Sequence, residues 1–467
     1  MKRQKTRRPS TCKVRRDWAG GKRGDGGRRA RRVRRPSPAT LHRGRPDRNL
    51  TSVAGLVSCG VWLRERGVDH ELARRFGHLK RDPRVVYPME CQMRLIMDAF
   101  LAGEGSVFGL EALAADPLFV HLAGGIVPSL DTVYADLGRF GAPEVESLEA
   151  MVAEHGLARL GAYRGAWAHL DIDTTVCPHD TEQLEGAVPG PNPRYHGRPS
   201  YHPMLARVAE LGTIVGAELR PGDRGLGAED VPRIRSWVRR AKQQLRKGTE
   251  LCVRIDAGGD CAEILEAIHQ EQAFYLVKAR ITPDVLRAMT ADARWKTTDR
   301  DADLRPIRQV TELPFAREVW AARGLDVRVI AVRSIERHGR QLPLPGSDRD
   351  WTVQVFLTNR VDDPDEIAWD YDGRAGIEPL IAELKGAWAI GLAASASFLA
   401  NHAVFLLKLL CHNLLDRYAR EMFSMAASWR TPWRRRLLIR APGRISCSGR
   451  RRVLHLLPGS PIAFQRE

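Results

Sequence analysis

The length of 467 residues allows about three domains of ordinary size, so the chain is neither a peptide nor a simple coiled coil. The formal net charge is +18, but the first fifty residues hold 19 Lys or Arg against three Asp and so carry +16 of it. The remaining residues are close to neutral. Affinity of the folded part for nucleic acid must therefore come from local clusters, and residues 430–452 contain one.

The cysteines and the hydropathy pattern indicate the cellular location of the protein. The eight cysteines include no C-x-x-C pair, which argues against a zinc ribbon or a disulfide framework and indicates reduced thiols. The basic N-terminus lacks the apolar run and cleavage site of a secretory signal, so we expect a cytoplasmic protein. Ala387–Leu407 has no charged residue over 21 positions and is long enough to span a bilayer. Because it contains Ser395, Asn401 and His402, we interpret it as a buried core helix and expect no membrane contact.

The N-terminal third divides into two parts. Residues 1–50 are rich in Arg, Gly and Pro without periodic apolar positions, which predicts a disordered basic arm. This arm is either an extension without a role or an arm that binds phosphates. Residues 51–160 carry apolar residues at intervals of three and four, which predicts a helical N-terminal domain with Ser129 and Thr132 as candidate caps. The domain either binds DNA through a helix-turn-helix or is an ordinary helical packing unit.

From residue 161 strands and helices alternate. WAHLDIDTTV predicts a strand, YHPMLARVAELGTIVGAEL predicts two more, and LCVRID and AFYLVKARI predict strands that follow helices. VTELPF, VRVIAVRSI and WTVQVFLTN predict further strands, and RISCSGRRRVLHLL predicts a hairpin. The predicted divisions are 161–281 for the first part of an α/β core, 282–365 for a β-rich insertion, 366–425 for the second part of the core and 426–467 for a basic C-terminal tail.

The stretch YDGRAGIEPLIAELK carries four polar side chains on one predicted helix face. At about 100° per residue, Arg374, Glu378 and Lys385 fall within about 40° of one another, and Tyr371 lies about 20° further round. An apolar stripe adjoins this face, so such a helix packs by one flank and offers the other to a cleft. Proline is tolerated in a first helical turn but breaks an interior, so Pro379 predicts that the helix begins close to Glu378 or is kinked there.

Three carboxylates come from separate predicted elements. Asp173 lies on the first core strand, Asp256 at the end of a central strand, and Glu378 on the helix. Two-metal phosphoryl transfer needs carboxylates that converge on ions about 3.5–4 Å apart. Asp171 lies about 6.6 Å from Asp173 on the same strand face, so either could bind metal. We favour Asp173 because it is nearer the strand end, and we expect Asp260 to cap a helix.

The spacing Y-x2-R-x3-E-x6-K at Tyr371, Arg374, Glu378 and Lys385 resembles that of the DDE transposases of bacterial insertion sequences. LDIDTTV, EQLEGA, NPRYHGRPSYHPMLA and RIDAGGD are similar to the group 1 branch, within it the insertion sequence 1380 family, and the resemblance covers roughly residues 55–460. The turn AGGD departs from the Ser-Gly-aromatic turn that is commoner there. The resemblance implies an α/β fold, with an RNase H-like mixed sheet flanked by helices and interrupted by the β-rich insertion.

The resemblance also implies a chemistry and its residues. Three carboxylates would hold two Mg²⁺ ions, which Mn²⁺ can replace, and the other three residues of the spacing would contact transposon-end DNA. The implied catalytic and metal-binding residues are Asp173, Asp256 and Glu378, and the implied DNA-binding residues are Tyr371, Arg374 and Lys385.

The implied activity is cleavage at insertion-sequence ends and strand transfer into target DNA by a cut-and-paste route, in the bacterial cytoplasm at the nucleoid. The implied partners are inverted-repeat DNA, target DNA and a second copy of the chain in a homodimer on DNA. A catalytically inactive end-binding protein and an RNase H-like nuclease remain as alternatives. Three carboxylates that face DNA phosphates would repel them, which argues against a protein that only binds DNA. The Y-R-E-K spacing and the insertion disfavour the nuclease.

Overall fold

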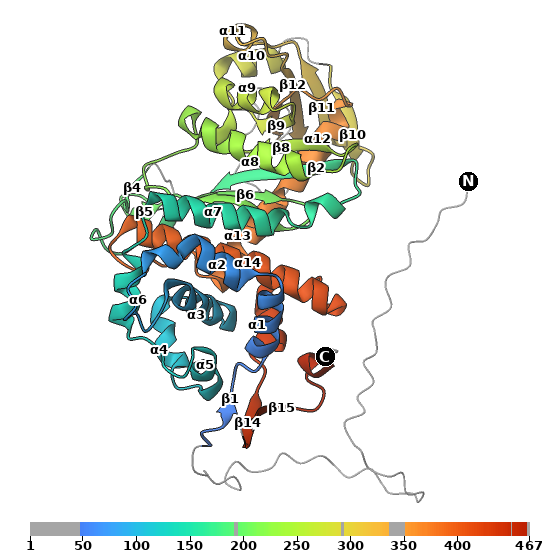
Figure 1. Ribbon diagram of the computed structural model, residues 1–467. Helices are drawn as coiled ribbons and strands as arrows, with labels where there is room; N and C mark the ends of the chain where they lie inside the picture. The colour runs from blue at the N-terminus through green and yellow to red at the C-terminus, as the bar shows by residue number, and fades with distance from the viewer. Residues whose placement is uncertain (1–46, 191–194, 291–293, 336–350, 450, 465–467) are drawn as a thin grey trace, which may run out of the picture. The chain divides into compact units, whose positions relative to one another are not determined.

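A computed structural model describes residues 47–190, 195–290, 294–335, 351–449 and 451–464 (Figure 1). The basic arm predicted for residues 1–50 therefore lies almost wholly outside the described residues. The described residues from Arg48 onward belong to one compact unit. This unit is a mixed α/β protein in which helices flank a large mixed sheet.

The first part of this unit is helical. Ser129 caps α6 as expected, because its hydroxyl accepts a hydrogen bond from the Thr132 amide at 3.3 Å. The apolar faces of these helices share one core with the long helix α14 (Phe398–Met422). The helices are α1 (Gly55–Glu65), α2 (Val68–Phe76), α3 (Met89–Ala102), α4 (Leu110–Leu113), α5 (Pro117–Leu122), α6 (Leu130–Leu137) and α7 (Ala142–Leu157).

A nine-stranded sheet follows, in the order β10-β11-β12-β13-β9-β8-β2-β6-β7. In its core part, β2 pairs antiparallel with β6 and parallel with β8, and β8 pairs parallel with β9. Helices α8 (Val231–Gln244) and α9 (Ala262–Gln270) cover one face. The core strands are β2 (Trp167–Thr174), β6 (Met204–Val208), β7 (Thr213–Glu218), β8 (Glu250–Ile255) and β9 (Phe274–Lys278).

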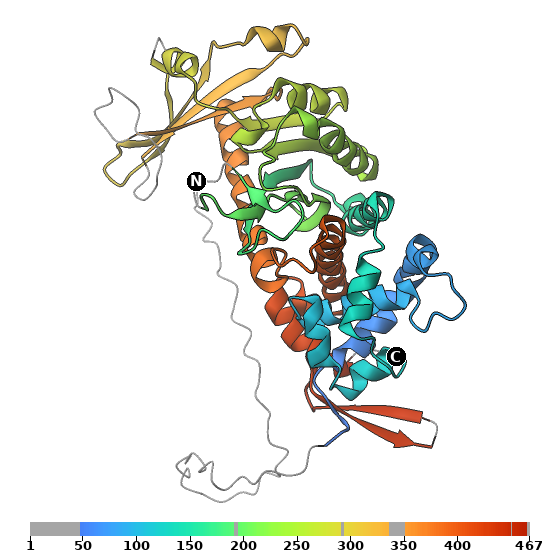
Figure 2. The same cartoon turned by 90° about the vertical axis from the view of Figure 1, so that its left-hand side faces the viewer.

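The region predicted as a β-rich insertion continues this sheet. Strand β13 (Thr352–Thr358) pairs antiparallel with β9, and the remaining strands add outward from it. Residues 282–365 therefore contribute an extension of the core sheet, shown at the top of Figure 2. The other elements are α10 (Pro283–Thr290), β10 (Lys296–Arg300), β11 (Pro306–Leu313), α11 (Glu318–Ala321) and β12 (Arg328–Ser334).

The stretch from Tyr371 to Lys385 is three segments, and its last helix begins beside Glu378, one of the two alternatives that Pro379 predicted. Tyr371 ends α12 (Pro364–Asp372), Arg374 lies in the short 3-10 helix η7 (Gly373–Gly376), and Glu378 is the second residue of α13 (Ile377–Ala387). Pro379 thus falls in a first turn, where its missing amide costs nothing.

The apolar segment that follows is a core helix, but it begins later than predicted. Residues 388–397 connect α13 to α14 (Phe398–Met422), which is long and apolar enough to cross a membrane. Its most apolar window is 89% buried inside the protein, where it contacts α3, α7 and β7. Asn401 is bonded there, because its side chain accepts from the Ala394 amide at 2.7 Å. Burial by the protein's own helices explains the composition.

The described C-terminal residues form the predicted hairpin. Strands β14 (Gly443–Ser448) and β15 (Arg451–Leu456) pair antiparallel, and the short strand β1 (Leu50–Thr51) adds to β14. A turn of α-helix, α15 (Thr431–Arg434), precedes them. A second small sheet lies beyond β2 and comprises β3 (Cys177–Pro178), β4 (Val188–Pro189) and β5 (Pro199–Tyr201).

Candidate active site

Two of the three predicted acids stand at the ends of adjacent parallel strands. Ile172 of β2 pairs with Ile255 of β8, and Asp173 and Asp256 are the next residues on the two strands. Neighbouring strands lie about 4.8 Å apart, so this register brings both aspartates to the same edge of the sheet. Open α/β sheets bind ligands at such carboxyl ends.

The Asp173 carboxylate lies in a strongly charged environment. Burial raises its pKa to about 6, the nearby Arg374 guanidinium opposes this, and the negative charge of Asp256 raises the pKa further. Asp173 Oδ1 lies 3.1 Å from Arg374 Nη2 and accepts a hydrogen bond from the Thr174 amide at 2.9 Å. Asp256 Oδ1 accepts one from the Gly258 amide at 3.0 Å. The ionised form of Asp173 is therefore disfavoured by burial and by the neighbouring carboxylate and favoured by Arg374.

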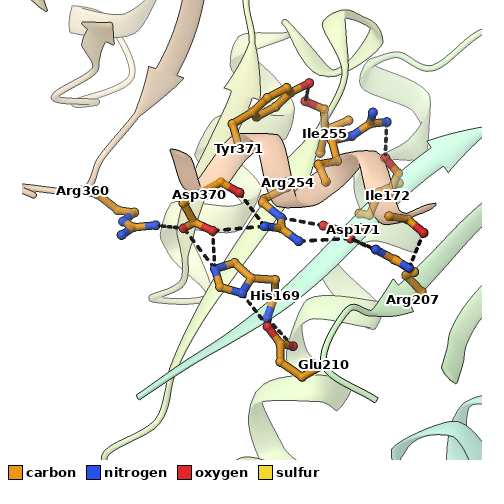
Figure 3. Close-up of polar contacts among 12 residues, drawn as sticks. His169, Asp171, Ile172, Arg207, Glu210, Arg254, Ile255, Arg360, Asp370 and Tyr371 are labelled. Carbon is orange, nitrogen blue, oxygen red and sulfur yellow. Dashed lines mark hydrogen bonds and ion pairs between the residues drawn. The ribbon is translucent and has the colours of Figure 1, made fainter. Parts of the chain in front are cut away.

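The three predicted DNA-binding residues all donate to main-chain carbonyls at these strand ends. Tyr371 Oη donates to Ile255 O at 3.3 Å, and Arg374 Nη2 donates to Ile172 O at 3.3 Å (Figure 3). These carbonyls belong to the residues immediately before Asp256 and Asp173. Lys385 Nζ donates to the carbonyl of residue 176 at 2.7 Å, just past the end of β2. The segment from α12 to α13 is thereby tied to both strand ends.

Tyr371 and Lys385 differ in how accessible they are. Tyr371 is only 8% exposed and its ring packs against Phe356 with a centroid distance of 4.4 Å. Burial raises the pKa of its hydroxyl. Lys385 is half-buried and lines a cleft together with Cys177 and Leu392. Lys385 is thus the one that borders open space.

Glu378 is exposed and makes no hydrogen bond or ion pair with any residue that the structure describes. It follows Arg374 by one helical turn, and Arg374 pairs with Asp173. The carbonyl of Gly376, between the two, accepts a hydrogen bond from Arg207 Nη1 at 2.6 Å. The backbone that leads to Glu378 is therefore held against the sheet while its carboxylate is left open to solvent.

Asp171, the competing metal ligand, is occupied by two arginines. Its carboxylate is fully buried and accepts from Arg207 Nε at 3.0 Å and from Arg254 Nε at 2.7 Å. Both arginines also donate a second hydrogen bond to Asp171 Oδ2. The two guanidiniums compensate the negative charge of this buried carboxylate, and three of the four hydrogen bonds go to Oδ2, so a metal ion would have to displace an existing ion pair. This supports Asp173 as the metal ligand and Asp171 as a structural acceptor.

The ion pairs of Asp171 belong to a larger network that the sequence analysis missed (Figure 3). Arg254 also bonds Asp370 of α12 at 3.0 Å, and Arg360 pairs with the same carboxylate. His169 lies between two acids, with Nδ1 2.6 Å from Glu210 and Nε2 3.0 Å from Asp370. The network links β2, the turn between β6 and β7, β8 and α12.

Hydrogen bonds to two acids favour the protonated form of the His169 ring. Burial disfavours the charged ring, but the hydrogen bonds to Asp370 and Glu210 outweigh it and raise the pKa of His169. The same contact, opposed by burial, lowers the pKa of Asp370 to about 2. His169, Cys252 and Asp370 lie close enough to hold a metal ion. The two arginines on Asp370 already supply the positive charge there, so this group is an ion-pair network.

One sequence signal could have revealed this network. His169, Asp171 and Asp173 alternate along β2 and so share a face, while Ala168, Leu170 and Ile172 face the apolar core on the other side. Charged residues at every second position of a central strand indicate buried partners, since unpaired buried charges are too costly to retain.

Asp260 does not cap a helix as expected. Cys261 is the N-cap residue of α9, and Asp260 instead pairs with Arg317 at the sheet extension and accepts from the Arg280 amide at 2.8 Å. The half-buried Arg317 therefore takes the Asp260 carboxylate that a cap would have used.

The acids at this edge suit a hard divalent cation. Asp173 and Asp256 offer carboxylate oxygens at the sheet edge, the ligand type that Mg²⁺ and Mn²⁺ prefer, and Glu378 on α13 is the predicted third carboxylate. Burial and the negative charge of Asp256 raise the pKa of Asp173, and Arg374 compensates in part. A divalent cation would relieve this repulsion, so the residues present fit such an ion.

Comparisons with known proteins identify the family of the chain. No curated protein matches the chain. Among solved structures, one that is similar is the cryo-EM structure of a piggyBac transposase synaptic complex with hairpin DNA, with 12% identity and a TM-score of 0.43, covering 82% of this chain and 79% of that one. Residues 44–463 match the family described as transposase DDE domain group 1. Since that match spans most of the sequence, the chain belongs to the group 1 DDE-domain transposases.

Proposed function

We propose that this transposase cleaves DNA at the ends of an insertion sequence and joins the freed 3′-hydroxyls to target DNA, by a cut-and-paste route. The observation that carries the proposal is the pairing of Ile172 with Ile255, which sets Asp173 and Asp256 side by side at one sheet edge. Glu378 is the third carboxylate. It is open to solvent on a segment that Arg374 ties to Asp173.

Asp173, Asp256 and Glu378 would hold two Mg²⁺ ions, which would supply an activated water and neutralise charge on the reacting phosphate. Lys385 borders a cleft beside β2 and would bind a backbone phosphate there. The Arg374 guanidinium, next to Asp173, would offset the negative charge that the phosphate brings.

For Tyr371 we propose a positioning role in addition to the DNA contact that the resemblance implies. Its hydroxyl donates a hydrogen bond to the carbonyl of Ile255, the residue before Asp256, and its ring packs against Phe356. A buried hydroxyl that already donates to the main chain fixes the end of β8. The direction of the Asp256 carboxylate then depends on this bond.

The wider assignments rest on the same function. Joining two transposon ends to one target requires two active sites, so we propose a homodimer on inverted-repeat DNA. The helical residues 51–160 are the proposed end-binding domain. We place the protein in the insertion sequence 1380 branch and in the bacterial cytoplasm, at the nucleoid.

The test incubates the protein with a duplex that carries the inverted repeat next to its own gene, a target plasmid and either Mg²⁺ or Ca²⁺. Joined products with Mg²⁺ support the proposal. Cleavage without joining indicates a nuclease, and a mobility shift without cleavage indicates a DNA-binding protein that has lost activity. Either of these two outcomes contradicts the proposal.

A further inference from the structure

Residues 424–464 form an unusual segment, here called the arginine segment. It contains nine arginines but no Lys, Asp or Glu. Two of the arginines are structural. Arg434 is buried and pairs with Asp416 at 2.7 Å, and Arg435 lies 3.8 Å over the Trp388 ring and donates to Phe100 O at 2.7 Å. These two hold the segment against α14 and α3.

Most of the exposed arginines that the structure describes in this segment lack an acidic partner. Within the described residues, five of them make no ion pair or side-chain hydrogen bond: Arg430, Arg436, Arg440, Arg451 and Arg452. Exposed arginines elsewhere in the folded unit often have an acid beside them. Arg84, with a side chain 90% exposed, pairs with Asp82 at 2.8 Å, and Arg287 pairs with Asp284. The positive charge of the arginine segment is therefore not compensated locally.

The segment presents this charge on a fixed hairpin. Strands β14 and β15 extend away from the helices in Figure 2. Each has six residues, so the hairpin is about 20 Å long. Its base is secured, because the Ile445 amide donates to Asn49 O at 2.8 Å and the Ile445 side chain is buried. Arg451 and Arg452 lie beside the turn at the far end, on opposite faces of the hairpin.

An exposed aromatic residue also lies in the arginine segment, in α15 ahead of the hairpin. Trp433 is 56% exposed, and the Arg436 guanidinium lies 5.6 Å from the centroid of its ring. Arginine with a nearby aromatic plane suits a ligand that offers both phosphates and flat or apolar sugar and base surfaces. Arginine in place of lysine also favours phosphate, because the planar guanidinium can bind two phosphate oxygens at once.

We propose that the arginine segment, through the β14–β15 hairpin and the turn around Trp433, is a second DNA-binding surface that grips the sugar-phosphate backbone of duplex DNA without reading its sequence. The choice of DNA as the polyanion rests on the proposed function. The surface lies outside the carboxylate site and uses none of its residues, so it would hold flanking or target DNA.

The test compares two double variants of the full chain that remove the same charge. R451A/R452A removes the two unpaired arginines at the hairpin tip, and the control R84A/R287A removes two exposed arginines that have acidic partners. Binding to a 30-base-pair duplex without transposon ends is measured by fluorescence anisotropy, in EDTA, between about 50 and 200 mM salt. Unchanged urea midpoints check that both variants are folded.

Each lost phosphate contact lowers the slope of log K against log salt by about 0.9, so R451A/R452A should lower it by up to about 1.8, with several-fold weaker binding at low salt. The control should keep the wild-type slope. Equal slopes in all three proteins would overturn the proposal. Binding of the same variants to vesicles of anionic lipid is measured in parallel. If R451A/R452A keeps the wild-type salt slope with DNA but no longer binds these vesicles, the proposal is also overturned. Because the assay uses no Mg²⁺ and no end sequence, an enzyme that fails to cleave can still pass it.

Discussion

Substitutions of Asp171 and Asp173 should change the free energy of unfolding in different ways. The two lie two residues apart on one face of β2, yet their surroundings are opposite. Asp171 is paired with two buried arginines, and removing one partner of a buried ion pair costs about 3–5 kcal/mol. We expect D171N to lower the free energy of unfolding by about that amount at pH 7.

Asp173 should behave in the reverse sense. Burial raises its pKa from 3.8 to about 6, so keeping it ionised at pH 7 costs the folded state roughly 3 kcal/mol. D173N removes this cost, which is already net of the favourable contact with Arg374. We therefore expect D173N to be at least as stable as the wild type while losing end cleavage.

Urea unfolding of the three proteins at pH 7 without divalent cation measures the difference, and the cleavage assay is run on the same preparations. The reasoning is refuted if D173N is destabilised as much as D171N. It is also refuted if D171N unfolds at the wild-type urea concentration, because the Asp171 ion pairs would then contribute no stability.

Three further predictions concern Tyr371, His169 and Gly156. Y371F should slow cleavage roughly tenfold and raise the Mg²⁺ concentration needed for half-maximal rate, with unchanged end binding; weaker binding at an unchanged rate would instead show a phosphate contact. The pKa of His169 is raised in the folded state, so the contribution of His169 to the free energy of unfolding is complete below pH 6.5 and is lost as pH rises through the folded pKa. The difference in free energy of unfolding between the wild type and H169N should therefore shrink from pH 6 to pH 9. A constant difference would contradict this. G156A should lower stability by about 1–3 kcal/mol because its Cβ would lie 2.0 Å from Ile214 O, whereas the control G386A, with open space around it, should not destabilise α13; equal melting temperatures for the two variants would contradict this.

The strand positions could be predicted from the sequence because they depend on local patterns. Alternation in WAHLDIDTTV and the apolar run LCVRID located β2 and β8, and their ends located Asp173 and Asp256. Pro379 located the start of α13 within two residues of Glu378.

The roles of the polar side chains on α12 to α13 depend on distant partners. A helical wheel assumes one continuous helix, but η7 separates Tyr371 from Glu378 and resets the phase. The carbonyls that Tyr371, Arg374 and Lys385 bind lie more than one hundred residues away in sequence. The spacing of residues in one segment carries no information about such distant partners. It therefore predicted only that these side chains share one side, facing DNA.

The ion-pair network could be predicted only in part. The alternation of His169 and Asp171 on β2 signals buried charge, but the partners Arg207, Arg254 and Asp370 come from three other elements. The same competition for buried charge removed Asp260 from its expected cap.

The most direct test of the central claim is single-turnover cleavage of an end-labelled transposon-end duplex in Mg²⁺ by D173N, D256N and E378Q. The matched control is E383Q, which changes the other glutamate of α13, whose carboxylate accepts from the Thr431 amide at 2.9 Å. We predict that the three variants bind the duplex but cleave it at least about a thousandfold more slowly, while E383Q cleaves normally. Wild-type cleavage by E378Q would contradict the assignment of Glu378 to the carboxylate triad.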